Sequence, residues 1–536
     1  MPSRSTARAR FATLLLFAAL TAAHTWPLAT APGTLSRNDN GDTLLIEWSL
    51  AWVAHQLPHD PLHLFDANIF YPAKHTLAFS EHLFTLAMMG APLRWAGASP
   101  VLVYNLLLLA GFTLTGWVTC LVVHHWTDDW IAGIVAGSIM AFNAQSLTRL
   151  PHLHYLHMEF FLLTLFALDR ALRDPTARNA LLLALCFVLQ ALTSNYHMVF
   201  TLEGMFAAVL ARPSDWTGPR FLPAARALGL AGLVSGVCIF PFLLPYYHTQ
   251  QDYGLTRRLS DAAMYAASMN DYLATGARVH FFTWSRRFYE RSGTALFPGV
   301  LPLVLALVAA STPAVRRDAR ARMCLAVGVA GFILSFGTSM PGYTLLYRAI
   351  PLLQGIRATH RMGYLVIVAV ATLAGFAVAL LRRRWSGKRW LTAASLAVIA
   401  VVNLEALRAP LWYKPYEGIS PIYDRLAAER RAVVVEFPLY PHRVYFANAP
   451  YMLNSTRHWK PLVNGYSAFY PPSFVEICDA LESFPSSDAI RALRERGVTH
   501  VVVHDDAFHV PDNVDGLSLI ERRDRISLYR VSSIHP

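Results

Sequence analysis

Long apolar segments recur along most of this 536-residue chain, and they constrain its fold more than any other feature. Hydrophobic residues make up 54% of the sequence and charged residues only 15%, which is unusual for a water-soluble chain of this length. We therefore predict a polytopic α-helical membrane protein with about eleven transmembrane helices. The candidate spans lie at residues 11–31, 100–123, 130–145, 153–172, 179–195, 197–211, 222–246, 296–311, 322–340, 360–381 and 390–408.

The positive charges predict how these spans are oriented. The formal net charge of +12 could suggest a nucleic-acid partner, but the arginines cluster in short loops between apolar segments, which is the pattern of membrane topology. Asp128 and Asp129 are an acidic exception among loops that we otherwise predict to be basic and cytoplasmic. The basic clusters on that side are Arg4/Arg8/Arg10, Arg170/Arg173/Arg178, Arg212/Arg220/Arg226, Arg316/Arg317/Arg320/Arg322 and Arg382/Arg383/Arg384/Lys388/Arg389.

The positions of the basic loops also predict the cellular location of the protein and the side of the membrane on which each terminus lies. Segment 11–31 is interpreted as an uncleaved first helix, with a signal peptide as the alternative. We therefore predict a multi-pass protein of the inner (plasma) membrane, with a cytoplasmic N-terminus, an extracytoplasmic C-terminal domain and no nucleic-acid partner.

Three longer stretches fall on the external side: a first loop at 32–99, a second loop at 247–295, and the chain from about residue 409. Within the first loop, segment 44–57 has the spacing of an amphipathic helix and segment 83–95 is a second apolar piece, and both are predicted to lie at the membrane interface.

The C-terminal segment differs in character from the rest of the chain. Runs of β-branched residues predict strands at 432–437, 498–504 and 527–531, with a helix at 473–496 between them. We predict a membrane domain at 1–408 and a small extracytoplasmic α/β domain at 409–536.

Two groups of polar residues in the first loop are candidates for chemistry. Asp39 and Asp42 directly follow the first span, while Glu81 and His82 lie near the end of the same loop. A carboxylate near a membrane can act as a general base, and an imidazole can polarise a phosphate or bind a metal. The structural alternatives are helix caps, by Asp42 or Thr43 at one helix and by the residues around Glu81 at the next.

Arginines on the predicted external side have no topological explanation. Arg357 and Arg361 are one helical turn apart, so their guanidinium groups could bind one anionic headgroup together. Arg286 lies in the second loop, and Tyr196 interrupts an apolar run near the external end of two spans. We take these four residues, together with Asp39 of the first loop, as candidates for substrate binding. The alternatives are solvated loop charge for the arginines and a simple turn at Tyr196.

Histidines 152, 154 and 157 flank the start of one span. Their spacing matches no strong zinc signature, so we interpret them as interface histidines rather than metal ligands.

The chain resembles integral-membrane glycosyltransferases of the GT-C fold, in bacterial branches related to the polyprenyl-phosphate-sugar-dependent mannosyl- and arabinosyltransferases. The resemblance rests on a first span, a long external loop with Gly41-Asp42 near its start and Ser80-Glu81-His82 near its end, many further spans and an external tail. The phrases Asp66-Ala-Asn-Ile-Phe-Tyr-Pro72, Arg357-Ala-Thr-His-Arg-Met362 and Asn448-Ala-Pro-Tyr-Met452 are similar to those of such bacterial proteins.

The resemblance implies an inverting hexosyl- or pentosyltransferase that uses a polyprenyl-phosphate sugar donor and a glycan, lipid or protein acceptor. Asp42 corresponds to the acid of the family's first loop and would be the general base. Glu81 and His82 would position the acceptor or the phosphate, and Arg357 with Arg361 would stabilise the leaving phosphate. Asp42, Glu81 and His82 could also hold a divalent cation, Mg²⁺ or Mn²⁺, although members of the fold also work without metal.

Two features limit what the resemblance implies. The Trp-Trp-Asp-Tyr-Gly sequence of oligosaccharyltransferases is absent, and Asp42 lacks the adjacent Asp-Glu pair of protein mannosyltransferases. Two other classes remain open: a transporter or flippase of a lipid-linked or anionic solute, and a non-catalytic assembly protein. A transporter would place its polar groups near the bilayer midplane.

Overall fold

The computed structural model describes residues 4–254, 257–292 and 294–532 of the chain. Parts of the predicted stretches 247–295 and 409–536, namely residues 255, 256, 293 and 533–536, lie outside the described residues. The chain divides into two compact units. We call them the helical unit (Met1–Ala31, Leu106–Phe240 and Thr256–Trp412) and the mixed unit (Pro32–Asn105, Pro241–Leu255 and Tyr413–Pro536).

This division differs from the predicted domains in two respects. Residues 32–99 and Pro241–Leu255 belong with the C-terminal segment rather than with the rest of residues 1–408. The boundary at Trp412/Tyr413 lies close to the predicted one at 408/409.

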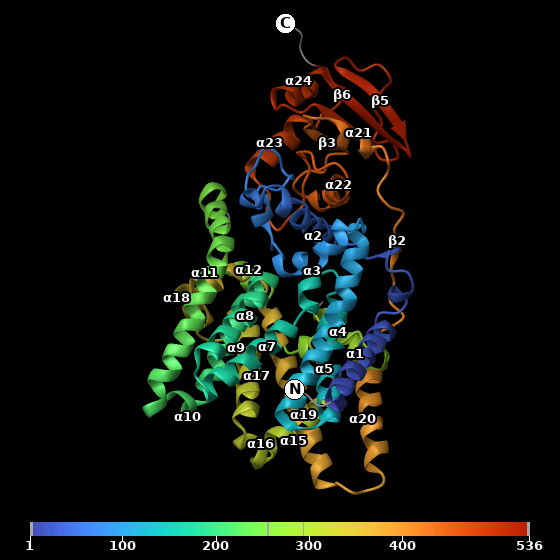
Figure 1. The fold of residues 1–536 in the computed structure, drawn as a ribbon. Helices are drawn as coiled ribbons and strands as arrows, with labels where there is room; N and C mark the ends of the chain where they lie inside the picture. The colour runs from blue at the N-terminus through green and yellow to red at the C-terminus, as the bar shows by residue number, and fades with distance from the viewer. Residues whose placement is uncertain (1–3, 255–256, 293, 533–536) are drawn as a thin grey trace. The chain divides into compact units, whose positions relative to one another are not determined.

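The helical unit is built almost entirely from α-helices (Figure 1). Its longer helices are α1 (Arg4–His24), α5 (Trp130–Ala141), α7 (Glu159–Arg173), α8 (Ala177–Thr193), α9 (Asn195–Leu210), α15 (Val300–Ser311), α17 (Ala319–Ser335), α19 (Tyr364–Arg384) and α20 (Leu391–Ala406). The unit boundaries fall within two further helices, α4 (Pro100–Thr127) and α11 (Phe221–Tyr253). Short helices link them: α6 (Ala144–Thr148), α10 (Pro213–Trp216), α12 (Leu259–Met264), α13 (Arg278–His280), α14 (Arg286–Ser292), α16 (Pro313–Arg317) and α18 (Tyr343–Ala349).

Four helical segments of the described chain are long and apolar enough to cross a membrane: Pro100–Thr127, Trp130–Thr148, Gly218–Tyr253 and Thr359–Arg384. Most of the other predicted spans fall on helices of 12 to 17 residues, which are α7, α8, α9, α15, α17 and α20. A helix of that length is shorter than the roughly 20 residues that a perpendicular span needs.

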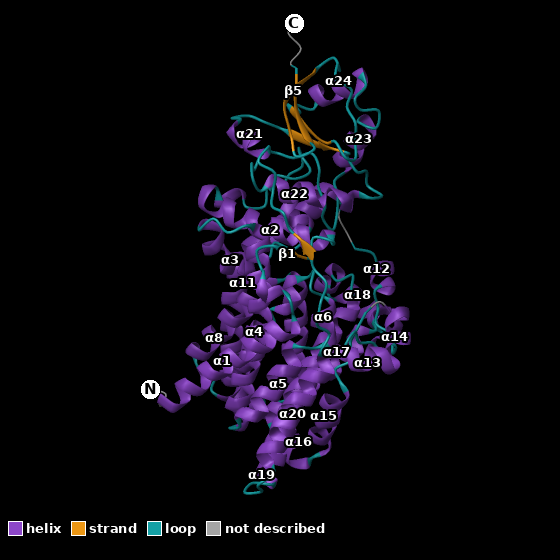
Figure 2. Ribbon diagram, turned by 90° about the vertical axis from the view of Figure 1, so that its right-hand side faces the viewer, coloured by secondary structure: helices purple, strands orange, loops and turns teal. Residues whose placement is uncertain are grey.

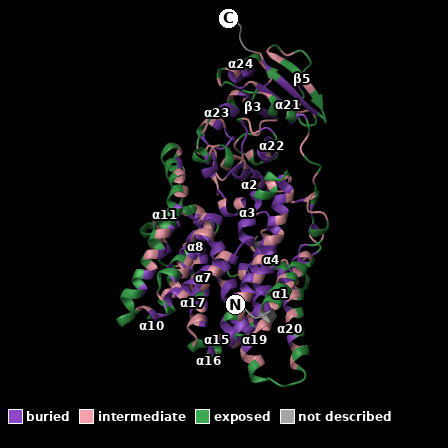
Figure 3. Cartoon of the chain, viewed as in Figure 1, coloured by how far each residue is buried: buried purple, intermediate pink, exposed green. Residues whose placement is uncertain are grey.

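Helix α19 forms the centre of the helical unit. It packs against α5, α15 and α17, and nearly all of its residues from Tyr364 to Ala379 are buried (Figure 3). Glycines allow the close approach of α17, because a Cβ at Gly328 would lie 2.3 Å from the Cβ of Ala369 and one at Gly331 would lie 2.4 Å from that of Leu365. Small residues at such crossings are how helices pack where no water drives association.

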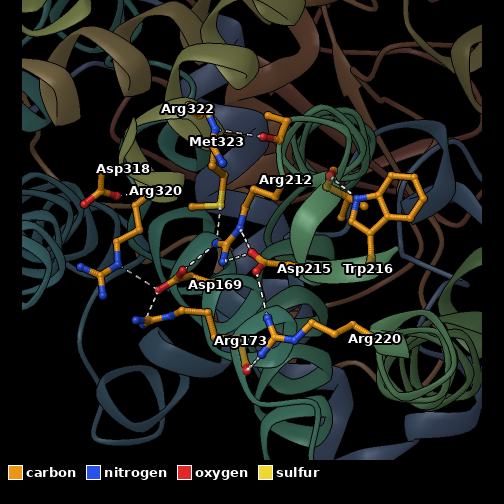
Figure 4. A network of polar contacts seen from close by, with 12 residues as sticks. Asp169, Arg173, Arg212, Asp215, Trp216, Arg220, Asp318, Arg320, Arg322 and Met323 are labelled. Carbon is orange, nitrogen blue, oxygen red and sulfur yellow. Dashed lines mark hydrogen bonds and ion pairs between the residues drawn. The ribbon is translucent and has the colours of Figure 1, made fainter. Parts of the chain in front are cut away.

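A network of ion pairs connects three of the loops that we predict to be cytoplasmic (Figure 4). The carboxylate of Asp169 at the end of α7 contacts Arg212, Arg173 and Arg320, at distances of 2.6, 2.7 and 3.4 Å. Arg212 is completely buried and also donates to Asp215 at 2.6 Å. The three basic loops thus share one carboxylate.

The acidic exception at Asp128 and Asp129 also has a local explanation. The Asp129 side chain caps α5 by accepting from the backbone N–H of Ala132 at 3.0 Å, and its other oxygen lies 2.7 Å from Nε of Arg382. An acid in this loop therefore neutralises part of the basic cluster at the end of α19.

The mixed unit joins the first loop to the C-terminal segment. Its helices are α2 (Gly41–His59), α3 (Phe84–Trp95), α21 (Tyr423–Ala428), α22 (Ala449–Ser455), α23 (Pro472–Ala480) and α24 (Ser487–Glu495). The amphipathic prediction for 44–57 is wrong, because all of residues 43–54 are buried; α2 packs against both α3 and α22. A helix that is covered on all sides is a core helix rather than an interfacial one.

A four-stranded sheet completes the mixed unit (Figure 2). Its strands β3 (Val434–Phe437), β4 (His500–His504), β5 (Leu517–Arg523) and β6 (Ile526–Val531) follow the order β3-β4-β6-β5, with β3 and β4 parallel and the other neighbours antiparallel. Three strands match predicted runs, whereas β5 was not predicted because it is mostly exposed and lacks a buried face. The predicted helix at 473–496 is split into α23 and α24 around Pro485. A second, two-stranded sheet pairs β1 (Leu35–Ser36) with β2 (Lys414–Pro415).

Residues 66–72 connect the first loop to the C-terminal segment through hydrogen bonds. The N–H groups of Phe70 and Tyr71 donate to the carbonyls of Asn464 and Leu462 at 3.3 and 2.9 Å. The Asn68 side chain accepts from Trp48 and donates to Ser455, both at 3.1 Å. These bonds explain why the two segments form one compact unit although they are far apart in the sequence.

Candidate functional site

Asp42 lies in the first turn of α2, but it does not cap that helix. The cap is Asn40, whose side chain accepts from the backbone N–H of Asp42 at 2.9 Å. The Asp42 carboxylate instead accepts a 2.7 Å hydrogen bond from the hydroxyl of Tyr466. A carboxylate at a helix N-terminus is favoured by the helix dipole. The capping alternative for Asp42 is therefore wrong, and the carboxylate is directed toward the C-terminal segment.

Asp39 and the acid–histidine pair of the first loop have different surroundings. Asp39 is exposed and pairs with Arg37 at 3.2 Å. His82 is buried among Phe65, Phe242 and Tyr246, and its Nδ1 accepts from the backbone N–H of Phe84 at 3.0 Å. Burial lowers the pKa of His82 to about 3, so this imidazole is neutral at physiological pH.

The acids of the first loop do not form a metal cluster with His82. Within residues 4–254, 257–292 and 294–532, no group of three His, Cys, Asp or Glu side chains could hold a metal ion. The side chain of Glu81, next to His82, is partly buried.

The mixed unit contains a further acid that sequence reasoning missed. Glu47 lies five residues after Asp42 in α2 and is only 1% exposed. With the Asn38 amide oriented to suit both groups, its nitrogen lies 2.9 and 3.1 Å from the two Glu47 oxygens. Burial raises the pKa of Glu47 well above its ordinary value, and the Asn38 hydrogen bond opposes this shift. The contact between Glu47 and Asn38 therefore fixes the segment that carries Asp39 and Asp42.

In the helical unit, Arg361 lies between two aromatic rings. Its guanidinium carbon is 4.9 Å from the ring centre of Tyr196 and 5.1 Å from that of Tyr155. Arg357 lies 5.2 Å over the ring of Tyr265, and its backbone N–H donates to the Tyr196 hydroxyl at 3.4 Å. Three of the predicted residues, Tyr196, Arg357 and Arg361, are therefore neighbours, held by cation–π contacts.

Arg149 and His360 lie beside Arg357 and Arg361 and were not predicted as site residues. Arg149 follows α6 and donates from Nη2 to Nε2 of His360 at 2.6 Å, while Nδ1 of His360 lies 2.8 Å from the carbonyl of Tyr265. The pKa of His152 is well below its usual value, because of burial first and then because of Arg361, Arg149 and Arg357. Three guanidinium groups thus raise the local positive potential. We call Arg149, Arg357, Arg361, Tyr155 and Tyr196 the arginine–tyrosine cluster.

Arg149 could not have been found by local pattern, since it lies 211 residues from its partner His360. Arg286, by contrast, lies on α14 and pairs with Glu290 at 2.7 Å; both side chains are exposed. His157 is completely buried and bonds to Glu159 at 2.7 Å and to the carbonyl of Leu107, which agrees with a structural role.

No family model and no curated protein matches the sequence. Among solved structures, the chain is similar to the arabinofuranosyltransferase AftD from Mycobacteria, with a TM-score of 0.65 at 15% identity over 99% of this chain. It spans only 40% of the length of AftD. It is also similar to the archaeal oligosaccharyltransferase AglB from Archaeoglobus fulgidus, solved with an inhibitory peptide and a dolichol-phosphate, with a TM-score of 0.52 at 12% identity over 94% of this chain and 70% of AglB.

Both of these proteins are membrane glycosyltransferases of the GT-C fold, and the chain has that fold. The resemblance inferred from the sequence is thereby confirmed at the level of fold.

Proposed function

We propose that the chain is a membrane glycosyltransferase that moves a sugar from a polyprenyl-phosphate donor to an acceptor hydroxyl on the non-cytoplasmic side. The observation that carries this proposal is the arginine–tyrosine cluster, in which Arg361 is 9% exposed and Arg149 and Arg357 add positive charge nearby. Three guanidinium groups close together attract an anion such as a phosphate.

The cluster suits a phosphate in its chemistry. Arginine presents a planar set of donors that matches phosphate oxygens, and the rings of Tyr155 and Tyr196 both contact the Arg361 guanidinium. In transfer, the bond between the anomeric carbon and the phosphate oxygen breaks and the oxygen keeps the electron pair. Donors that are already in place stabilise the charge that develops on it.

Asp42 is proposed as the general base. The acceptor hydroxyl gives its proton to the Asp42 carboxylate while its oxygen forms a bond to the anomeric carbon from the side opposite the phosphate, which inverts that centre. Glu81 and His82 are proposed to position substrate, and Asp39 and Arg286 stay predicted substrate contacts. A Mg²⁺ or Mn²⁺ requirement is a separate proposal that the test below includes.

The test is transfer of a radiolabelled sugar from a panel of polyprenyl-phosphate sugars by the purified chain in lipid, with and without chelator. Asp42→Asn should lower transfer by about 100-fold or more, since general base catalysis commonly contributes that much. Asn keeps an oxygen that can accept from Tyr466, so the variant should fold. Asp60→Asn, an exposed change at the other end of α2, is the matched control.

Equal transfer by wild type and Asp42→Asn would remove the role of Asp42. Absence of transfer from every donor, together with movement of a labelled lipid-linked solute across the bilayer, would favour the transporter alternative.

A further inference from the structure

A row of aromatic side chains extends from Asp42 across the C-terminal segment. The ring of Tyr466, whose hydroxyl bonds to Asp42, lies 5.3 Å from that of Tyr445, and Tyr445 lies 5.2 Å from Tyr470. Tyr470 in turn lies 6.1 Å from His442. All four side chains are partly exposed, and all belong to the mixed unit. We call these four residues the aromatic row.

The phrase Asn448-Ala-Pro-Tyr-Met452 holds the aromatic row in place. The buried side chain of Asn448 donates to the carbonyls of Tyr440 and Tyr445 at 2.8 and 3.1 Å and thereby fixes the loop that carries His442. The sulfur of Met452 lies 3.0 Å from the backbone nitrogen of Tyr466. Residues 448–452 therefore fix the backbone at Tyr445 and Tyr466, two members of the aromatic row.

Phe70 of the first loop packs against the backbone next to Tyr466. A Cβ at Gly465 would lie 2.6 Å from ring atoms of Phe70, so only glycine fits next to Tyr466. The Tyr445 hydroxyl is also fixed, because it donates to the carbonyl of Ser467 at 2.7 Å. Rings that are held by backbone contacts lose little freedom when they bind a ligand.

We propose that the aromatic row is the binding surface for a carbohydrate acceptor, whose ring carbons pack on the tyrosines while one hydroxyl reaches Asp42. This inference rests on the proposed function, which requires a hydroxyl at Asp42, and it selects a glycan among the glycan, lipid and protein acceptors. A sugar ring has an apolar face of C–H groups and a rim of hydroxyls. Tyrosine offers the matching combination of an apolar face and a polar tip.

The test measures binding without the donor, so it does not depend on transfer. The purified full chain in lipid nanodiscs is titrated with linear oligosaccharides of arabinose, mannose, glucose or rhamnose, and binding is followed by saturation-transfer NMR. The variants are Tyr470→Ala, Tyr470→Phe and, as a control for an exposed apolar truncation in the same unit, Leu519→Ala. A peptide that contains serine and threonine serves as the competing acceptor class.

We expect at least one oligosaccharide to bind, with the Kd raised about fivefold or more in Tyr470→Ala because an aromatic contact is lost. Tyr470→Phe should stay within about twofold of wild type because it keeps the ring face, and Leu519→Ala should do so because it leaves the aromatic row unchanged. No glycan binding, equal binding by Tyr470→Ala, or displacement of the glycan by the peptide would overturn the inference. Glycan binding without transfer from any donor would instead contradict the proposed function and leave the binding surface standing.

Discussion

The hydroxyl of Tyr466 donates a 2.7 Å hydrogen bond to Oδ1 of Asp42, which lies 424 residues earlier in the chain. This bond fixes the carboxylate on the first turn of α2 against the C-terminal segment. The C-terminal segment therefore contributes to the surroundings of the proposed base.

The first prediction concerns Tyr466→Phe. Removing the hydroxyl should lower kcat for sugar transfer about tenfold, because a hydrogen bond to a charged group contributes about 1.5–3 kcal/mol. The KM for the donor should not change, since Tyr466 is assigned to the acceptor side. Steady-state kinetics of wild type and variant measure both quantities. Tyr253→Phe, which loses a hydroxyl bonded to the backbone of Lys74, is the matched control, and an unchanged kcat in Tyr466→Phe would refute the positioning role.

A second prediction tests the arginine–tyrosine cluster. Arg361→Lys keeps the positive charge but loses the planar guanidinium between Tyr155 and Tyr196. We expect the KM for the polyprenyl-phosphate donor to rise about tenfold, because bidentate phosphate recognition is lost. Arg389→Lys, an exposed change beyond α19, should leave the KM as it is. A similar KM in all three proteins would mean that the cluster does not bind donor phosphate.

The sequence predicted the class of fold because apolar segments and basic loops are local signals. It predicted β3, β4 and β6 because β-branched runs are local as well. It could not predict Tyr466 beside Asp42 or Arg149 beside His360, since these partners are distant in sequence and single polar residues show no periodicity. The burial of Glu47 was missed for a related reason. Helix α2 was interpreted as one-sided, but the C-terminal segment covers its other side.

A third prediction concerns the pH dependence of stability. Because the pKa of Glu47 is raised in the folded protein, the native state holds its proton at pH values where the unfolded chain, with an ordinary value of 4.5, has lost it. The stabilisation from the protonated form is therefore complete below about pH 4.5 and decreases as the pH rises toward the folded pKa. Glu47→Gln mimics the protonated form, so its Tm advantage over wild type should grow from pH 4 to pH 8. Thermal unfolding in detergent measures this, with the exposed Glu476→Gln as control.

Parallel Tm curves for wild type and Glu47→Gln would show that Glu47 is ionised in the native state. In that case Asn38 would be stabilising a carboxylate rather than holding the loop to a neutral acid.

The fourth prediction concerns the buried ion pair between Asp169 and Arg212, whose side chains are completely inaccessible and 2.6 Å apart. Asp169→Ala leaves the Arg212 guanidinium buried with less compensation, so we expect a loss of about 3–5 kcal/mol of stability. Arg220→Ala, which breaks a half-exposed pair with Asp215 in the same network, should cost less than about 1 kcal/mol. Denaturation midpoints in detergent compare the two, and the double variant Asp169→Leu/Arg212→Met should recover much of the loss, because it removes both buried charges together. Equal losses in Asp169→Ala and Arg220→Ala would mean that water or lipid headgroups screen the network, and that the basic loops are held together by helix packing alone.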